Sequence, residues 1–191
     1  VMKRRTLLKK AQKSSLDGDF TSVETLTLRL LKNDPENAEA LFLLGTAQSE
    51  LGKFNKAIET LQKATALNSG DGAIFNNLGN AFLALANYDS ARESFDKALA
   101  INPDNDTYHA NQGISLFKMH RYQQALESFD KAISLNPESI DSHIKSAICL
   151  LRCGEFESSV NKLLQLIERE PDNSEVYIQL TSCLLYMHAT D

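Results

Sequence analysis

Residues 78–103 read LGNAFLALANYDSARESFDKALAINP, and residues 112–137 read QGISLFKMHRYQQALESFDKAISLNP. The second stretch repeats the first, with Gly, Ala, Phe, Ala and Pro at the same places, so that Gly79 aligns with Gly113 and Pro103 with Pro137. Self-similarity at a fixed period of about 34 residues is typical of repeat proteins, in which one short unit is stacked many times. The sequence therefore predicts an array of such units.

The period continues on both sides of these two stretches. Leu44-Gly45 lies one period before Leu78-Gly79, and prolines close four of the units, at Pro35, Pro103, Pro137 and Pro171. Complete units are predicted at residues 4–37, 38–71, 72–105, 106–139 and 140–173, followed by a half unit at 174–191. Because neither a linker nor a change of register interrupts them, we expect residues 1–191 to form a single solenoid.

Each unit has a signal for a tight turn near its middle. Glycine, which readily adopts the left-handed conformation of such turns, lies there in three units, at Gly18, Gly52 and Gly154. Ala86 and His120 hold this place in the other two units, and an aromatic residue still follows two positions later. We therefore expect the same turn there without glycine.

A small residue and a large residue recur at fixed places of the units. A small residue lies at Gly45, Gly79 and Gly113, and a large one follows at a constant offset, at Leu61, Phe95 and Phe129. Small residues let two backbones approach, and the large residue fills the space beside them. With the alanines and the closing proline, this pattern resembles the tetratricopeptide repeat family. The resemblance implies an all-α fold, a right-handed superhelical solenoid of antiparallel helix hairpins.

Composition excludes several classes of protein. The chain is 42% hydrophobic and 24% charged, with a formal net charge of −5. No apolar run has the roughly 20 residues of a membrane span, and no signal peptide is visible. The three cysteines do not form a disulfide framework, so we expect a cytoplasmic protein. Val1 before Met2 and the incomplete last unit suggest a fragment of a longer protein.

The N-terminal segment is strongly basic. Residues 1–13 contain no acid and six basic side chains, at Lys3, Arg4, Arg5, Lys9, Lys10 and Lys13. Such a stripe can steer nucleic acids or membranes, or it can be the solvated face of a terminal helix. No aromatic residue is interleaved to stack on bases. We therefore expect neither a nucleic acid nor a membrane as partner.

The C-terminal segment is apolar instead. Nine of the twelve residues from Val176 to Met187 are apolar, whereas a terminal solenoid helix needs a polar outer face. Either further sequence covers this face in the parent protein, or the face docks on another chain. Self-association through residues 176–187 is one form of the second alternative.

No catalytic or cofactor site is evident. The chain has no glycine-rich nucleotide loop of either common type. Cys149, Cys153 and His143 are close enough in sequence for a soft metal site, but small buried side chains are the simpler interpretation. We expect no metal, no cofactor and no catalytic residues.

The family resemblance implies where partners bind. In the family the first helix of each repeat lines a concave groove, through its second, fifth, sixth, ninth, twelfth and thirteenth places. Reading those places in this chain selects Asn76, Asn77, Asn80, Asn111, Ile114, Phe117, Ile144, Lys145, Ile148, Leu151, Ile178 and Gln179.

Two groups of groove residues suggest how a partner is held. Asn77 and Asn111 lie at equivalent places, and an amide can pair with both backbone groups of an extended peptide. This row is similar to the asparagine ladder of O-linked N-acetylglucosamine transferases, but the same amides can bridge neighbouring helices instead. The apolar members, from Ile114 to Ile178, suit an amphipathic helix or an extended apolar segment, unless some of them belong to the core.

A carboxylate clamp is not expected. In the family, proteins that bind acidic chaperone tails use a Lys, Asn, Asn, Lys and Arg set, and the equivalent places here are Asn76, Asn80, Asn111, Asp141 and Lys145. Both clamp lysines are missing, and Asp141 would repel a carboxylate. We therefore predict that the partner is not an acidic C-terminal tail.

The functional prediction is a scaffold or adaptor that binds protein or peptide segments and has no catalysis of its own. One alternative is the substrate-recognition arm of a larger glycosyl-, sulfo- or methyltransferase whose catalytic domain follows residue 191. Another is a scaffold that assembles with itself through the apolar C-terminal helix.

Overall fold

The computed structural model of the chain describes residues 4–190, and the side chains of residues 4–187. Lys3 of the basic segment and Asp191 of the half unit lie outside the described residues. The described part contains eleven α-helices and no strand, which confirms the predicted all-α fold. The helices fall into two compact units, one up to Pro103 and one from Asp104 onward.

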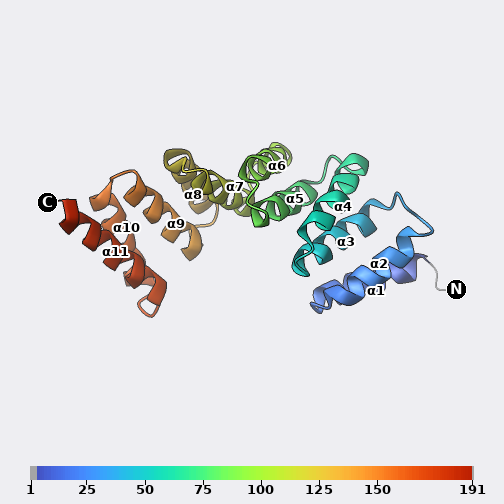
Figure 1. The fold of residues 1–191 in the computed structure, drawn as a ribbon. Coiled ribbons are helices and arrows are strands. Elements are labelled where there is room, and N and C mark those ends of the chain that lie inside the picture. Colours follow the sequence, from blue (N-terminus) through green and yellow to red (C-terminus); the bar gives the residue numbers. More distant parts are fainter. Residues whose placement is uncertain (1–3, 191) are drawn as a thin grey trace. The chain divides into compact units, whose positions relative to one another are not determined.

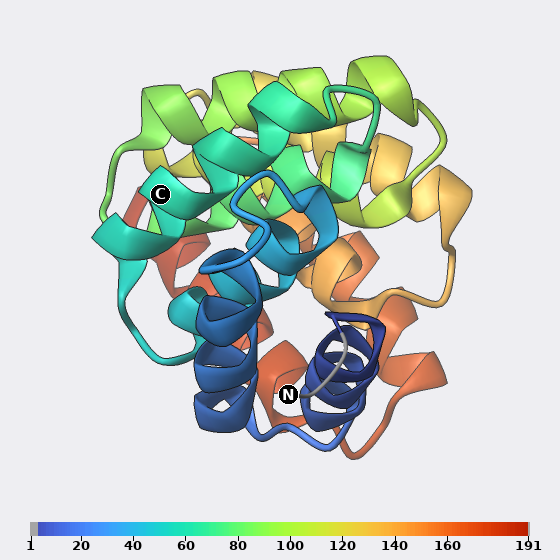
Figure 2. The same cartoon turned by 90° about the vertical axis from the view of Figure 1, so that its right-hand side faces the viewer.

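The first unit is a stack of three helix hairpins (Figure 1). Its helices are α1 (Arg4–Leu16), α2 (Phe20–Leu31), α3 (Ala38–Glu50), α4 (Phe54–Leu67), α5 (Gly72–Ala84) and α6 (Tyr88–Ile101). Each helix packs against the next one in the chain, and Figure 2 shows the α1 and α2 hairpin nearest the viewer.

The second unit contains two hairpins and one further helix. Its helices are α7 (Asp106–Lys118), α8 (Tyr122–Leu135), α9 (Ile140–Arg152), α10 (Phe156–Arg169) and α11 (Ser174–Thr190). Each of them again packs against its successor, and α11 also contacts α9. In both units the first helix of every hairpin, and α11, begins at the first residue of a predicted repeat.

These starts have a local cause in helix capping. The last residue of a repeat accepts a hydrogen bond from a backbone N–H of the first turn that follows: Asn37 from Ala40 at 2.9 Å, Asp71 from Ala73 at 2.9 Å, and Asn105 from Tyr108 at 3.0 Å. Such caps satisfy backbone N–H groups that have no partner inside the helix. A capping residue at the end of a repeat therefore restarts the helix in register.

The turns between paired helices confirm the prediction made for Ala86 and His120. Both residues have the left-handed conformation, with φ of 56° and 60°, and Gly52 has it in the equivalent turn with φ of 71°. Residues with a Cβ adopt this conformation at a cost of about 1 kcal/mol. The surrounding hairpin therefore imposes the turn even where the local sequence disfavours it.

Replacing Ala86 by glycine is accordingly expected to raise the free energy of unfolding by about 0.5–1 kcal/mol, because glycine adopts a positive φ without strain. Thermal unfolding followed by circular dichroism measures the change. Ala84→Gly, at the last residue of α5, is the control and should lower stability by up to about 1 kcal/mol. Equal effects of the two substitutions would contradict a strained turn at Ala86.

The cores of the hairpins are built from the predicted pairs of small and large residues. Leu61, Phe95 and Phe129 are all fully buried. A Cβ added to Gly79 would lie 2.5 Å from the Phe95 ring, and one added to Gly113 would lie 2.8 Å from the Phe129 ring. Only glycine leaves room for the aromatic ring at these two places.

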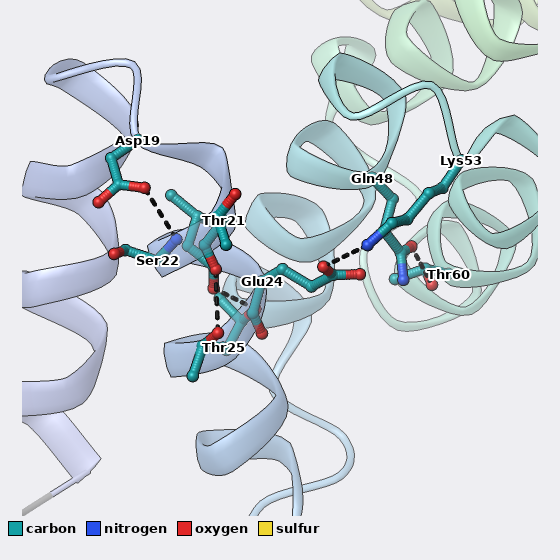
Figure 3. A network of polar contacts seen from close by, with 10 residues as sticks. Asp19, Thr21, Ser22, Glu24, Thr25, Gln48, Lys53 and Thr60 are labelled. Carbon is teal, nitrogen blue, oxygen red and sulfur yellow. Dashed lines mark hydrogen bonds and ion pairs between the residues drawn. The ribbon is translucent and has the colours of Figure 1, made fainter.

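Polar contacts connect the helices outside this core (Figure 3). The Lys53 ammonium, just before α4, lies 2.6 Å from a carboxylate oxygen of Glu24 on α2. On the next pair of helices, the Thr60 hydroxyl donates to the Gln48 side-chain oxygen at 2.8 Å, and both side chains are buried. The buried amide oxygen thus has a partner, as burial of a polar group requires.

The basic residues of α1 lie on its outer side. Arg4 donates to the Asn33 carbonyl at 2.8 Å and lies 3.8 Å from the Asp34 carboxylate. The rest of this basic set in the described chain is exposed to solvent: Arg5, Lys9, Lys10 and Lys13. None of the helices within residues 4–190 is long and apolar enough to cross a membrane.

Candidate functional site

An apolar pocket of about 190 Å³ opens on the second unit. Residues of α7, α8, α9 and α11 line it: Ile114, Phe117, Lys118, Phe129, Ile144, Lys145, Ile148 and Glu175. Five of these belong to the groove register, the set of residues predicted to line the groove from their places in the first helix of each repeat. They are Ile114, Phe117, Ile144, Lys145 and Ile148. The structure therefore brings together the predicted groove residues of two successive repeats.

The spacing along two helices explains the walls of the pocket. Ile114 and Phe117 are three positions apart on α7, and Ile144 and Ile148 are four apart on α9, so each pair shares one face of its helix. The Phe117 ring is held edge-on against Tyr122, with centroids 5.2 Å apart. Tyr122 therefore supports the Phe117 ring from one side.

The part of the pocket lined by Phe129 depends on the small residue of α7. Phe129 on α8 is fully buried and still lines the pocket. Its ring lies directly against Gly113, where a Cβ would approach to 2.8 Å. The ring that fills the hairpin core thus also lines the site.

Charged side chains of both signs also line the pocket. Lys118 and Glu175 are exposed, and the Lys145 ammonium forms an ion pair with Asp141 one turn earlier on α9. Because Asp141 neutralises Lys145, this pair adds no net charge to the rim. The site offers an apolar cavity with a donor group on Lys118 and an acceptor group on Glu175 at its edge.

Sequence reasoning missed three lining residues. Lys118 is the thirteenth residue of its helix and Glu175 the second of α11, and both places belong to the inward set that the family register implies. Completing the register would have found them. Phe129 lies on a second helix, where the sequence pattern predicts packing alone, and no sequence signal distinguishes a buried ring from one that also reaches a pocket.

Other members of the predicted apolar stripe lie in different surroundings. Ile144 and Leu151 are only 3% and 8% exposed and pack in one core cluster with Leu163 and Val176. For these two residues the core alternative holds, although Ile144 also reaches the pocket wall. Ile178 lies outside the pocket and is exposed on α11, where Gln179 is half-buried.

The predicted amide row does not line the pocket. Asn77 on α5 donates its side-chain N–H to the Thr46 hydroxyl on α3 at 2.9 Å, so it bridges neighbouring helices. Asn76 is buried and Asn80 exposed on the same helix of the first unit. Asn111, half-buried on α7, belongs to the second unit.

Two of the three cysteines, Cys149 and Cys183, are buried and pack as small side chains. Cys153 is exposed, so the packing interpretation is wrong for this residue. Burial, with smaller contributions from Cys153 and Asp130, raises the pKa of Cys149 to about 12, so its thiol is protonated at neutral pH. Within the described residues, no group of three or more His, Cys, Asp or Glu side chains is arranged to hold a metal ion.

Several solved structures share this fold. MamA superposes with a TM-score of 0.80 at 24% identity, over 88% of this chain and 92% of its own. A tetratricopeptide repeat protein from Parabacteroides merdae gives 0.85 at 22% identity, over 97% of this chain and 73% of its own. YrrB, described as a tetratricopeptide repeat protein with an unusual peptide-binding site, gives 0.73 at 19% identity, over 85% and 84%. At these identities the likeness shows the fold alone.

Models of the tetratricopeptide repeat family match the sequence of this chain. They match residues 26–59, 44–106 and 107–139. No curated protein gives a significant sequence match. The match over residues 107–139 coincides with the predicted repeat at 106–139. The family matches together span more than half of the chain, and the chain therefore belongs to the tetratricopeptide repeat family.

Proposed function

We propose that the chain is a protein-binding module with no catalysis of its own, and that its pocket takes one large apolar side chain from an extended segment of a partner. The observation that carries this proposal is the apolar pocket of about 190 Å³ between predicted groove residues. An apolar cavity of roughly 150 Å³ is large enough for benzene. A leucine, methionine or phenylalanine side chain therefore matches the available volume.

The rim favours an extended segment over a helix. An extended backbone presents N–H and C=O groups that have no partner within the segment, whereas a helix has satisfied most of its own. The Lys118 ammonium can donate to such a carbonyl, and the Glu175 carboxylate can accept from such an N–H. The apolar side chain supplies most of the binding free energy, and the two rim groups select the backbone direction.

Two further observations agree with this proposal. YrrB, which has the same fold, is described as having a peptide-binding site. The three cysteines of this chain are free, which suits a reducing compartment, and we propose the cytoplasm as the setting.

Selection from a phage-displayed library of random peptides tests the proposal against many candidate segments at once. Enriched peptides are expected to share one large apolar residue at a fixed position and no helical periodicity around it. The affinity of a synthetic version is then measured by isothermal titration calorimetry. Enriched peptides without a common apolar position would contradict the proposed occupant.

Variants of the pocket then locate the binding site. Ile148→Asp is expected to weaken a selected peptide at least tenfold, about 1.4 kcal/mol, because it places a carboxylate in the apolar wall. Leu164→Asp is the matched control, since Leu164 is 46% exposed on α10 and lies outside the pocket. Circular dichroism establishes that both variants are folded.

A second variant avoids any effect on packing. Lys118→Ala combined with Glu175→Ala removes only exposed rim groups and should weaken the peptide about threefold to tenfold. A peptide that binds both pocket variants as tightly as the original chain does not use this site.

A further inference from the structure

The last helix carries an exposed apolar surface that is separate from the pocket. On α11, Tyr177 is 43% exposed, Ile178 60%, Leu184 42% and Leu185 67%. On the other side of the helix, Val176 and Cys183 are buried in the core of the second unit. We call the four exposed residues, together with Thr181 between them, the α11 face.

The repeat register shows that one member of this face, Leu184, lies at a place that other repeats cover. Leu184 occupies the eleventh place of its helix, and the residues at this place in three other repeats, Gln48, Leu116 and Leu150, are only 5%, 6% and 9% exposed. Leu116, for example, packs with Ala125 and Phe129 of the helix that follows it. The eleventh place of a first helix is therefore built to receive another helix.

The arrangement of the α11 face is symmetric about Thr181. Tyr177 and Ile178 precede it by four and three positions, and Leu184 and Leu185 follow it by three and four. With a rise of about 1.5 Å per residue, the large pairs lie roughly one turn to either side of a small central residue. A second identical helix, antiparallel and rotated by two-fold symmetry about Thr181, would place its Leu184 on Ile178 and its Leu185 on Tyr177.

The polar groups on this surface do not oppose such pairing. The stretch from Val176 to Met187 has no charged residue, so two copies bring no like charges together. The Thr181 hydroxyl already donates to the Tyr177 carbonyl at 2.8 Å, and the neighbouring Ser182 hydroxyl donates to the Ile178 carbonyl at 2.9 Å. Burying Thr181 at the crossing point therefore leaves its hydroxyl with a partner.

We propose that the α11 face binds the α11 face of a second copy of this chain, forming a two-fold symmetric, antiparallel helix pair centred on Thr181. A two-fold interface uses one surface twice and must be complementary to itself. The symmetric placement of large residues around a small one meets this condition.

Sedimentation equilibrium over the micromolar range tests the assembly. The 21.2 kDa chain is expected to approach twice this mass as its concentration rises, and Leu185→Glu to weaken association at least tenfold. Leu164→Glu is the matched control, because Leu164 is similarly exposed on α10 but is not part of the α11 face. Persistent monomer in the original chain would overturn the proposal and leave another protein or further sequence as the occupant.

Cross-linking tests the geometry independently of stability. Thr181→Cys in a Cys153→Ser background, which removes the exposed natural thiol, is expected to form a disulfide-linked dimer under mild oxidation. Gln165→Cys in the same background places the new thiol at an exposed position of α10 and should stay monomeric. Dimers that are unaffected by Leu185→Glu, or that do not cross-link through residue 181, would show a different interface.

Discussion

Replacing Phe95 by alanine is expected to lower the free energy of unfolding by about 3–5 kcal/mol. The Phe95 ring is fully buried and lies against the backbone of α5 at Gly79. Gly79 has no side chain that could move into the vacated space, so the cavity stays nearly as large as the ring itself. Urea denaturation followed by far-ultraviolet circular dichroism measures the loss.

A second phenylalanine of the same hairpin provides the control. Phe75 on α5 is half-buried, and the Lys97 ammonium lies 6.0 Å from its ring centroid. Because solvent and Lys97 already border this ring, Phe75→Ala is expected to cost about 1–2 kcal/mol. If both substitutions had the same effect, the pairing of Phe95 with Gly79 would not be the dominant contact of the hairpin.

Replacing Gly79 by alanine is expected to lower the free energy of unfolding by about 1–3 kcal/mol, although alanine is the better helix former. In an unobstructed helix interior this change would stabilise the protein by about 1 kcal/mol. Here the new Cβ would lie 2.5 Å from the Phe95 ring, which is enclosed and has no room to retreat. The sign of the measured change therefore tests the close approach directly.

The fifth repeat suggests how the clash is relieved. It has Ala147 and Leu163 at the places of Gly79 and Phe95, and both are buried in one core cluster. A leucine side chain is smaller than a phenyl ring and can change rotamer. Adding Phe95→Leu to Gly79→Ala is therefore expected to recover at least about 1 kcal/mol relative to the sum of the single effects. Strictly additive changes in a double-mutant cycle would contradict direct contact between the two positions.

Much of the fold could be predicted from the sequence because the same pattern of residues recurs in successive repeats. The small and large residues recur at equal spacing, and the structure begins α3, α5, α7 and α9 at the predicted repeat starts. Even the turns at Ala86 and His120 were predictable, since the neighbouring repeats show glycine at the same place and the structure gives both residues a positive φ.

The candidate site could be predicted only in part. The groove register placed Ile114, Phe117 and Ile148 on one surface, and they do line one pocket. It did not separate Leu151, which is buried in the core, from these neighbours. It also left open whether Asn77 faces a ligand, and the structure shows its amide bonded to Thr46 on the adjacent helix.

This difference between fold and site has a physical reason. Some properties are determined within the length of one repeat, and others by the packing of several helices. The repeat length, the helix boundaries and the small residues that admit close packing all follow from the linear sequence, because they depend on backbone propensities and spacing within about 34 residues. Which groove residues meet at a cavity, and which apolar residues of α11 stay exposed, became clear only from the packed helices. Those outcomes depend on the rotation of each helix and on the volumes of neighbouring side chains, which belong to no single repeat.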